Sequence, residues 1–157
     1  MNLKIITTGG TIDKTYSTNR GTESLSIGEP SIERIFERIP YSVEYKLTEL
    51  CRIDSLDMQR SDRRKISQEV RETAYQNILI THGTDGMVET ARHLKEQNFN
   101  KSIVLVGASK PEVFKHSDAD INVGGALSAL DLIDYTVKIA IHGRVHDPMN
   151  VRKNENG

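Results

Sequence analysis

The chain has 157 residues, the size of one domain, and this length excludes a two-domain enzyme. Its 21 basic and 22 acidic residues nearly cancel, so the charge gives no indication of nucleic acid or an anionic membrane as a partner. One cysteine excludes an intramolecular disulfide and, with an N-terminal sequence unlike a secretory leader, predicts a cytoplasmic location. No apolar run reaches the ~18 residues of a membrane span, and we expect a small-molecule partner.

Five short segments rich in β-branched and aliphatic residues are predicted as strands. In chain order they are 3–8, 43–50, 77–81, 102–108 and 137–142. The segments 77–81 and 102–108 are almost continuously apolar, which is typical of parallel strands buried on both faces of a sheet.

Amphipathic helical patterns separate the strands, and they are predicted to begin at polar residues that can cap a helix, namely Ser31, Ser61, Asp85 and Asn122. Segments 12–30 and 109–121 are expected to be irregular. The resulting order, β-α-β-α-β-α-β-α-β, predicts a single α/β domain over residues 1–157. We expect a doubly wound, mostly parallel sheet with helices on both faces, a three-layer arrangement similar to flavodoxin-like and Rossmann-like folds.

Residues capable of chemistry directly follow the predicted strands. Segment 8–11 follows the first strand, Asp54 and Ser55 follow the second, and segment 82–85 follows the third. Ligands of open α/β sheets bind outside the carboxyl ends of the strands, where such loops converge. The sequence therefore predicts that these three clusters belong to one site.

Each cluster also has an ordinary structural interpretation. The two glycines before Thr11 can expose its hydroxyl and bring backbone N–H groups close to a ligand, although the pattern on its own favours a plain turn. Asp85 can cap a helix or, together with Thr84, bind an ammonium group. Lys153 can act as a base in a buried setting, but a lysine this close to the end of the sequence is ordinarily solvated.

Other kinds of site find little support. The glycine pattern is neither G-x-G-x-x-G nor a P-loop, which argues against a nucleotide. His142, His146 and Asp147 have metal-binding side chains, but a strand end followed by Pro148 does not fix ligand geometry, and we expect no metal. Cys51 lacks the flanking signature of a catalytic thiol and is interpreted as a small buried hydrophobe.

Two motifs together resemble the signature pair of the bacterial-type L-asparaginase/glutaminase family. They are Thr7-Thr8-Gly9-Gly10-Thr11-Ile12 and Ile80-Thr81-His82-Gly83-Thr84-Asp85. Further segments are similar to other parts of the family pattern, at 53–58, 106–111, 117–122 and 143–153. The resemblance covers almost the whole chain and indicates a short, single-domain form of the family.

The resemblance implies a threonine mechanism. Thr11 would attack the side-chain amide of asparagine to give a β-aspartyl ester and ammonia, and Tyr16 would assist the nucleophile. Thr84, Asp85 and Lys153 would form a second triad that activates water or supports proton transfer.

The resemblance also implies how substrate is held. Ser55 would bind the α-carboxylate and Asp85 the α-ammonium, while backbone N–H groups near Thr11 and Thr84 would hold the developing oxyanion. The substrate-binding residues expected are Gly10, Asp54, Ser55, Gly83, Thr84, Asp85 and Ala108. No cofactor is expected.

The chain departs from the family pattern at three points. Gly86 stands where a threonine usually follows Thr-Asp, and Leu56 stands where a glutamine is common. The family's C-terminal domain, which completes the amine site across an intimate dimer, has no counterpart in these residues. A pocket built by this domain alone would be open on one side, so we expect a homo-oligomer, a dimer or tetramer, with sites near an interface.

Three functions are consistent with these observations. The first is an L-asparagine amidohydrolase, with L-glutamine as a possible second substrate. The second is a catalytically weak or silent amino-acid-binding domain, and the third is a glutaminase or amidotransferase-like subunit that needs a partner chain. One methylene in a small pocket changes affinity by only ~1–3 kcal/mol, so the sequence does not distinguish asparagine from glutamine.

Overall fold

The main sheet has six strands in the order β4-β1-β5-β6-β7-β8. The computed structural model describes residues 2–19, 22–39 and 43–154. The strands are β1 (Asn2–Thr7), β4 (Glu44–Glu49), β5 (Asn77–Thr81), β6 (Ser102–Val106), β7 (Val137–Ile141) and β8 (Arg144–His146). The first five are parallel, and they are the five strands predicted from sequence. The short β8 was not predicted, and it pairs antiparallel with β7.

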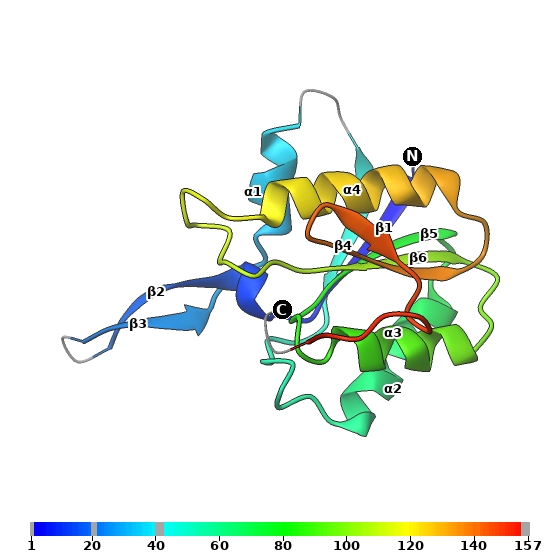
Figure 1. The fold of residues 1–157 in the computed structure, drawn as a ribbon, viewed down its shortest axis with the longest axis horizontal. Coiled ribbons are helices and arrows are strands. Elements are labelled where there is room, and N and C mark those ends of the chain that lie inside the picture. The colour runs from blue at the N-terminus through cyan, green and yellow to red at the C-terminus, as the bar shows by residue number, and fades with distance from the viewer. Residues whose placement is uncertain (1, 20–21, 40–42, 155–157) are drawn as a thin grey trace.

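Helices cover both faces of this sheet (Figure 1). Helices α1 (Ile32–Glu37) and α4 (Ala119–Leu132) share one apolar core with Leu79 of β5. Helices α2 (Arg60–Glu72) and α3 (Met87–Glu96) share the other core with Ile78 and Ile80 of the same strand. Successive strand residues point to opposite faces, so a nearly continuous apolar strand supplies both cores. The predicted three-layer α/β fold is confirmed.

Three helices begin at residues other than the predicted ones. Helix α2 is capped by Gln59, which exchanges hydrogen bonds with Asp62 in a capping box, and not by Ser61. The N-cap of α3 is Gly86, one residue after Asp85, and the N-cap of α4 is Asp118, four residues before Asn122. Ser31 does occupy the N-cap of α1, but its hydroxyl donates to Asp13 instead of capping the helix. The side chains of Ser31, Asp85 and Asn122 make tertiary contacts, which local capping preferences do not report.

Residues 12–30 are more regular than expected. A 3-10 turn, η1 (Thr11–Asp13), leads into an antiparallel hairpin of β2 (Lys14–Asn19) and β3 (Thr22–Ile27) that projects from the body of the domain (Figure 1). Asp13, just before β2, holds the two ends of the hairpin together. Its buried carboxylate accepts hydrogen bonds from the Ser31 N–H at 2.8 Å and the Ser31 hydroxyl at 2.7 Å. The pKa of Asp13 is raised, chiefly because burial penalises the charged form. In the other segment expected to be irregular, 109–121, α4 already begins at Ala119.

Candidate functional site

The loops after β1 and β5 meet at two glycines. Thr8, the residue after β1, donates its N–H and its hydroxyl to the Thr81 carbonyl, at 3.2 and 2.8 Å. Two residues further along each loop, a Cβ added to Gly10 would lie 2.4 Å from the Cα of Gly83. Gly10 also has φ +90°, a conformation in which L side chains are strained. Only glycine satisfies both conditions. The residues that follow, Thr11 and Thr84, therefore begin on adjacent loops.

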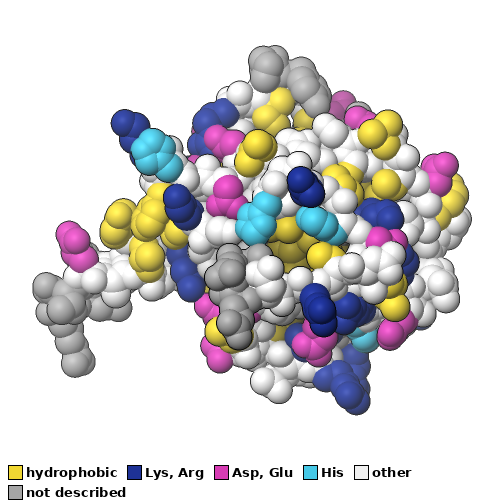
Figure 2. All heavy atoms as spheres, in the orientation of Figure 1, with side chains coloured by type: hydrophobic (Ala, Val, Ile, Leu, Met, Phe, Trp, Pro, Cys, Tyr) yellow, Lys and Arg dark blue, Asp and Glu magenta, His cyan; other side chains and the backbone are white. Residues whose placement is uncertain are grey.

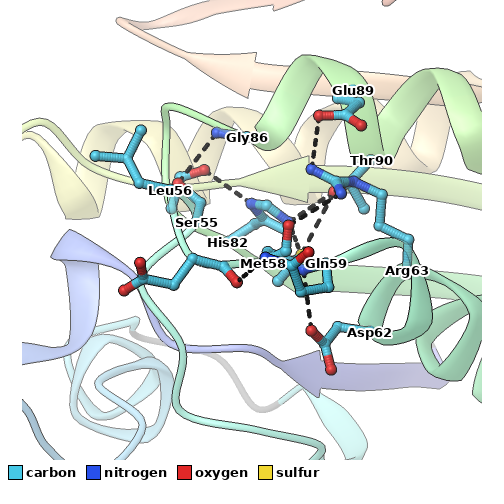
Figure 3. Close-up of polar contacts among 12 residues, drawn as sticks. Ser55, Leu56, Met58, Gln59, Asp62, Arg63, His82, Gly86, Glu89 and Thr90 are labelled. Carbon is cyan, nitrogen blue, oxygen red and sulfur yellow. Dashed lines mark hydrogen bonds and ion pairs between the residues drawn. The ribbon is translucent and has the colours of Figure 1, made fainter.

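The predicted Asp54-Ser55 segment reaches the same place. A hydrogen bond from the Ile53 N–H to the Thr8 carbonyl, 3.0 Å long, fixes the chain against the end of β1. Ser55 is buried, and its hydroxyl oxygen accepts the Gly86 N–H at 3.1 Å (Figure 3). A hydroxyl that accepts one hydrogen bond still has its own proton to donate, so Ser55 can present that proton to an anion.

Gly86, one of the departures from the family pattern, has a packing role. A Cβ at this position would lie 2.8 Å from the Ser55 carbonyl oxygen, closer than such contacts allow. A Cβ on Gly83 would likewise lie 2.5 Å from the Ser55 hydroxyl oxygen. The Ser55 loop therefore packs directly against the backbone of the 83–86 turn because that turn has glycine at both positions.

Asp54 is held by two contacts of its own. One carboxylate oxygen accepts the Leu56 N–H at 3.2 Å, and the other is 3.0 Å from Lys14 Nζ at the base of the hairpin. The hydrogen bond from Lys14 is the main reason why the pKa of Asp54 is lowered. Asp54 thus connects the Ser55 loop to the hairpin, and its predicted role in substrate binding remains a prediction.

Lys153 reaches the turn after β5. Its ammonium nitrogen lies 2.6 Å from Asp85 Oδ1 and 3.0 Å from Thr84 Oγ1. The Lys153 and Asp85 side chains are 35% and 42% exposed, so the ion pair is open to water. These are the three residues that the resemblance groups as a triad, and the structure brings them together.

The segment that carries Lys153 is anchored along α3. Arg92 donates to the carbonyls of Pro148 and Val151, each at 2.8 Å. Asp147 accepts hydrogen bonds from Lys95 at 2.6 Å and Lys138 at 2.9 Å, and these contacts lower its pKa well below the usual range. These anchors were missed by sequence reasoning, since none of them belongs to a motif. The position of Lys153 therefore depends on side chains from α3 and β7 that hold the segment before it.

A pocket of about 190 Å³ opens beside the Lys153 cluster. Figure 2 shows it as a hollow with apolar side chains on its floor and histidine side chains at its rim. Its lining residues are Thr84, Met87, Val88, Ser109, Ile139, Ile141, His142, His146, Val151, Arg152 and Lys153. Thr11 and Ser55 do not belong to this set, so the pocket borders the Lys153 side of the cluster. No group of three or more His, Cys, Asp or Glu side chains suited to a metal occurs in the described part of the chain.

Two other predicted residues have clear surroundings. Tyr16 lies in β2, is 62% exposed, and stacks on Phe114 with ring centroids 5.9 Å apart. Ala108 is buried just after β6, beside Gly107, where a Cβ would lie 2.4 Å from the His82 carbonyl oxygen. Cys51 is half-buried, and desolvation raises the pKa of its thiol.

The fold and these loops define an α/β domain with a threonine, aspartate and lysine cluster at the carboxyl ends of parallel strands. The family model described as "Asparaginase, N-terminal" matches residues 2–157. The chain therefore belongs to the asparaginase family, as the motifs predicted.

Named relatives match this chain over part of their own length. The "Probable L-asparaginase periplasmic" of Haemophilus influenzae is 30% identical over 132 residues, which cover 80% of this chain and 38% of that protein. One of the subunits of the glutamyl-tRNA(Gln) amidotransferase of Archaeoglobus fulgidus is 29% identical, with 97% of this chain and 39% of that protein covered. The thermostable L-asparaginase of Thermococcus kodakarensis superposes with a TM-score of 0.82 at 25% identity, covering 94% of this chain and 46% of that one. The chain thus spans less than half the length of these relatives.

Proposed function

We propose that this domain hydrolyses the side-chain amide of L-asparagine to L-aspartate and ammonia. The observation that carries the proposal is the contact of Lys153 with Thr84 and Asp85, beside the glycine contact that brings Thr11 to the same loops. Two hydroxyls, a carboxylate and an ammonium at strand ends form a set that covalent acyl transfer requires.

In the first step, the Thr11 hydroxyl oxygen attacks the amide carbon of the substrate. The C–O bond forms, the C–N bond breaks, and the hydroxyl proton leaves with ammonia, so the product is a β-aspartyl ester of Thr11. Backbone N–H groups at the Thr11 and Thr84 turns hold the oxygen that becomes negative during the attack. Tyr16, from the hairpin that follows Thr11, assists the nucleophile.

In the second step, water hydrolyses the ester and restores Thr11. Lys153 donates hydrogen bonds to both Thr84 and Asp85, which leaves the Thr84 proton free to be shared with an incoming water or a leaving group. The exposed ion pair gives this water direct access. Proton transfer is therefore the role of Thr84, Asp85 and Lys153, whereas Thr11 is the nucleophile that attacks the amide carbon.

The substrate ends are held by neighbouring groups. We assign the α-carboxylate to Ser55 and the α-ammonium to Asp85, with Asp54 behind the Ser55 loop. Gly10, Gly83 and Ala108 supply backbone around the reacting amide. The substrate class is a small amino-acid amide, and L-glutamine is the second candidate.

Ammonia release from L-asparagine, L-glutamine and D-asparagine, measured in parallel, tests the proposal. We expect turnover of L-asparagine by the wild type and at least a 10²-fold loss in Thr11→Ala, since removal of a covalent nucleophile leaves only binding and electrostatic assistance. A folded wild type that releases no ammonia, or a Thr11→Ala variant with unchanged turnover, contradicts it.

A second candidate is a subunit that works only with a partner chain, because one relative is named as an amidotransferase subunit. An isolated chain that binds asparagine without turnover, detected as a rise in melting temperature, would favour either this candidate or a silent binding domain. Recovery of Thr11-dependent turnover on adding a partner chain would separate the two.

We further propose that the domain assembles as a homo-oligomer, a dimer or tetramer, and acts in the cytoplasm. The exposed Lys153 and Asp85 side chains are where a neighbouring copy would close the site. In the described part of the chain no helix is long and apolar enough to cross a bilayer. Sedimentation beside the ammonia assay tests the assembly, and a fully active monomer would show it to be wrong.

A further inference from the structure

His82 is a buried titratable residue to which the proposed mechanism gives no role. It follows β5 directly, and its side chain is 0% exposed. Burial lowers its pKa to about 4, so the imidazole is neutral at physiological pH. A neutral imidazole carries one N–H and one bare nitrogen, and its neighbours decide which is which.

The neighbours of His82 fix the tautomer (Figure 3). Nδ1 lies 2.8 Å from the Gly83 carbonyl oxygen, which can only accept, so Nδ1 carries the proton. Nε2 is therefore bare and accepts the hydroxyl proton of Thr90 at 2.9 Å. The Met58 sulfur, 3.2 Å from the same nitrogen, has no proton to give.

The hydrogen-bond chain continues to a group that cannot lose its proton. The Thr90 hydroxyl oxygen accepts the Arg63 Nε–H at 3.2 Å. Arg63 is buried, donates to the Met58 carbonyl at 3.2 Å, and pairs at 2.7 Å with Glu89, a largely exposed side chain. The direction of each hydrogen bond is therefore fixed: Arg63 donates to Thr90, and Thr90 donates to His82. His82 in turn donates to the Gly83 carbonyl.

The last hydrogen bond of this series, from His82 to the Gly83 carbonyl, fixes the orientation of the Gly83–Thr84 peptide. In a trans peptide the C=O and the following N–H point in opposite directions. The Gly83 carbonyl is bound to the buried His82 ring, so the Thr84 N–H points away from the ring. We propose that Arg63, Thr90 and His82 are positioning residues, which orient this peptide so that the Thr84 N–H serves as an oxyanion donor and the Thr84 and Asp85 side chains meet Lys153.

This inference rests on the proposed amide hydrolysis for its catalytic consequence, but the hydrogen-bond chain can be tested without it. Thr90→Val keeps the shape of the side chain and removes the hydroxyl, while Thr90→Ser retains the hydroxyl as a matched control. Ring nitrogens observed by ¹⁵N NMR in histidine-labelled protein report the tautomer, and hydrogen exchange of residues 83–86 reports the order of the turn.

We expect an Nδ1–H, Nε2-bare ring in all three proteins, because the Gly83 carbonyl is unchanged. In Thr90→Val the Nε2 resonance should shift, since this nitrogen loses its hydrogen bond, and exchange over 83–86 should be faster than in the wild type and Thr90→Ser. Ammonia release should fall at least 10-fold in kcat for Thr90→Val with little change in KM, and recover in Thr90→Ser. If Thr90→Val does not fold, Arg63→Lys, which keeps the charge beside Glu89 and loses the planar Nε–H, is expected to show the same pattern.

The outcomes separate the two proposals. A wild type without turnover contradicts the proposed function, while the NMR and exchange results still test the positioning chain. An Nε2–H tautomer in the wild type overturns the chain itself. A shifted Nε2 resonance and faster exchange over 83–86 in Thr90→Val, with unchanged kcat, overturn the positioning role.

Discussion

Lys153 Nζ lies 2.6 Å from Asp85 Oδ1, although 68 residues separate them in the sequence. The contact joins the segment after β8 to the turn after β5, and it depends on the anchors that hold that segment along α3. Because both side chains are partly exposed, solvent screens their attraction, and the pair contributes little to folding. Its value lies in placing an ammonium group beside the Thr84 hydroxyl.

Lys153→Met is therefore expected to separate activity from stability. Ammonia release should fall about 10²–10⁴-fold, the usual range for loss of a proton-transfer group, while the melting temperature changes little. Lys65→Met, which removes an exposed lysine paired with Asp62 on α2, is the matched control and should retain activity. Equal activity in both variants would show that Lys153 has no part in the reaction.

The Gly10–Gly83 contact predicts a site that does not tolerate a methyl group. Gly10→Ala places a Cβ 2.4 Å from Gly83 and forces alanine to φ +90°, which should cost about 1–3 kcal/mol of unfolding free energy and abolish ammonia release. Gly124→Ala is the control, because apart from the local helix backbone nothing lies within 4 Å of its added Cβ. On helix α4 that change should stabilise the domain by about 0.5–1 kcal/mol. Similar urea midpoints for the two variants would contradict the assignment.

The parts of the fold that the sequence predicts are those governed by local pattern. The β5 segment is buried over Ile78 to Thr81, so its apolar run alone reveals a strand. The hairpin was missed because β2 and β3 are mostly polar and the hairpin base is closed by Asp13 and Ser31, two residues 18 positions apart. An isolated hairpin of this kind is marginal in water without such contacts.

In the site, too, the features set by local sequence pattern could be predicted, and those set by contacts between distant residues could not. The glycine motifs predict the two turns, because close backbone approach demands glycine wherever it occurs. The position of Lys153 depends on Arg92 and Asp147, whose contacts span up to 59 residues, and no spacing rule reports them. Asp85 was expected to begin α3, but Lys153 binds its carboxylate and Gly86 takes the N-cap position.

Ser55→Ala is expected to raise KM for asparagine at least 10-fold with a smaller effect on kcat, since the hydroxyl holds a substrate end remote from the reacting carbon. It also removes the acceptor of the buried Gly86 N–H, which should cost about 1–3 kcal/mol of unfolding free energy. Ser61→Ala, at an exposed position of α2, is the control. A fall in kcat alone, with KM unchanged, would place Ser55 elsewhere in the mechanism.

Asp147→Asn is expected to lower activity from a distance. The amide loses the charge that binds Lys95 and Lys138 but can still accept the Met149 N–H, so the local turn should persist. We expect a loss of about 1 kcal/mol in unfolding free energy and faster hydrogen exchange over residues 147–153. Activity should fall in parallel with that exchange. Glu72→Gln, which changes an exposed carboxylate on α2, should alter neither quantity.

His82 predicts how stability depends on pH. Its pKa is lowered from 6.5 to about 4 in the folded state, so between these values the unfolded chain binds a proton that the native state excludes. Stability from this residue is fully present above pH 6.5 and is lost as pH falls through 4. A shift of this size corresponds to about 3 kcal/mol.

Unfolding by urea at a series of pH values from 7 to 4 measures this loss, and His82→Asn provides the comparison. Asparagine can retain a donor close to the position of Nδ1 but does not titrate, so the slope of unfolding free energy against pH should be smaller in the variant. The raised pKa of Asp13 acts in the opposite sense at the acidic end, but it is common to both proteins and cancels in the difference. Equal slopes of unfolding free energy against pH in the two proteins would mean that protonation of His82 does not destabilise the folded state. The ring would then not be enclosed as described.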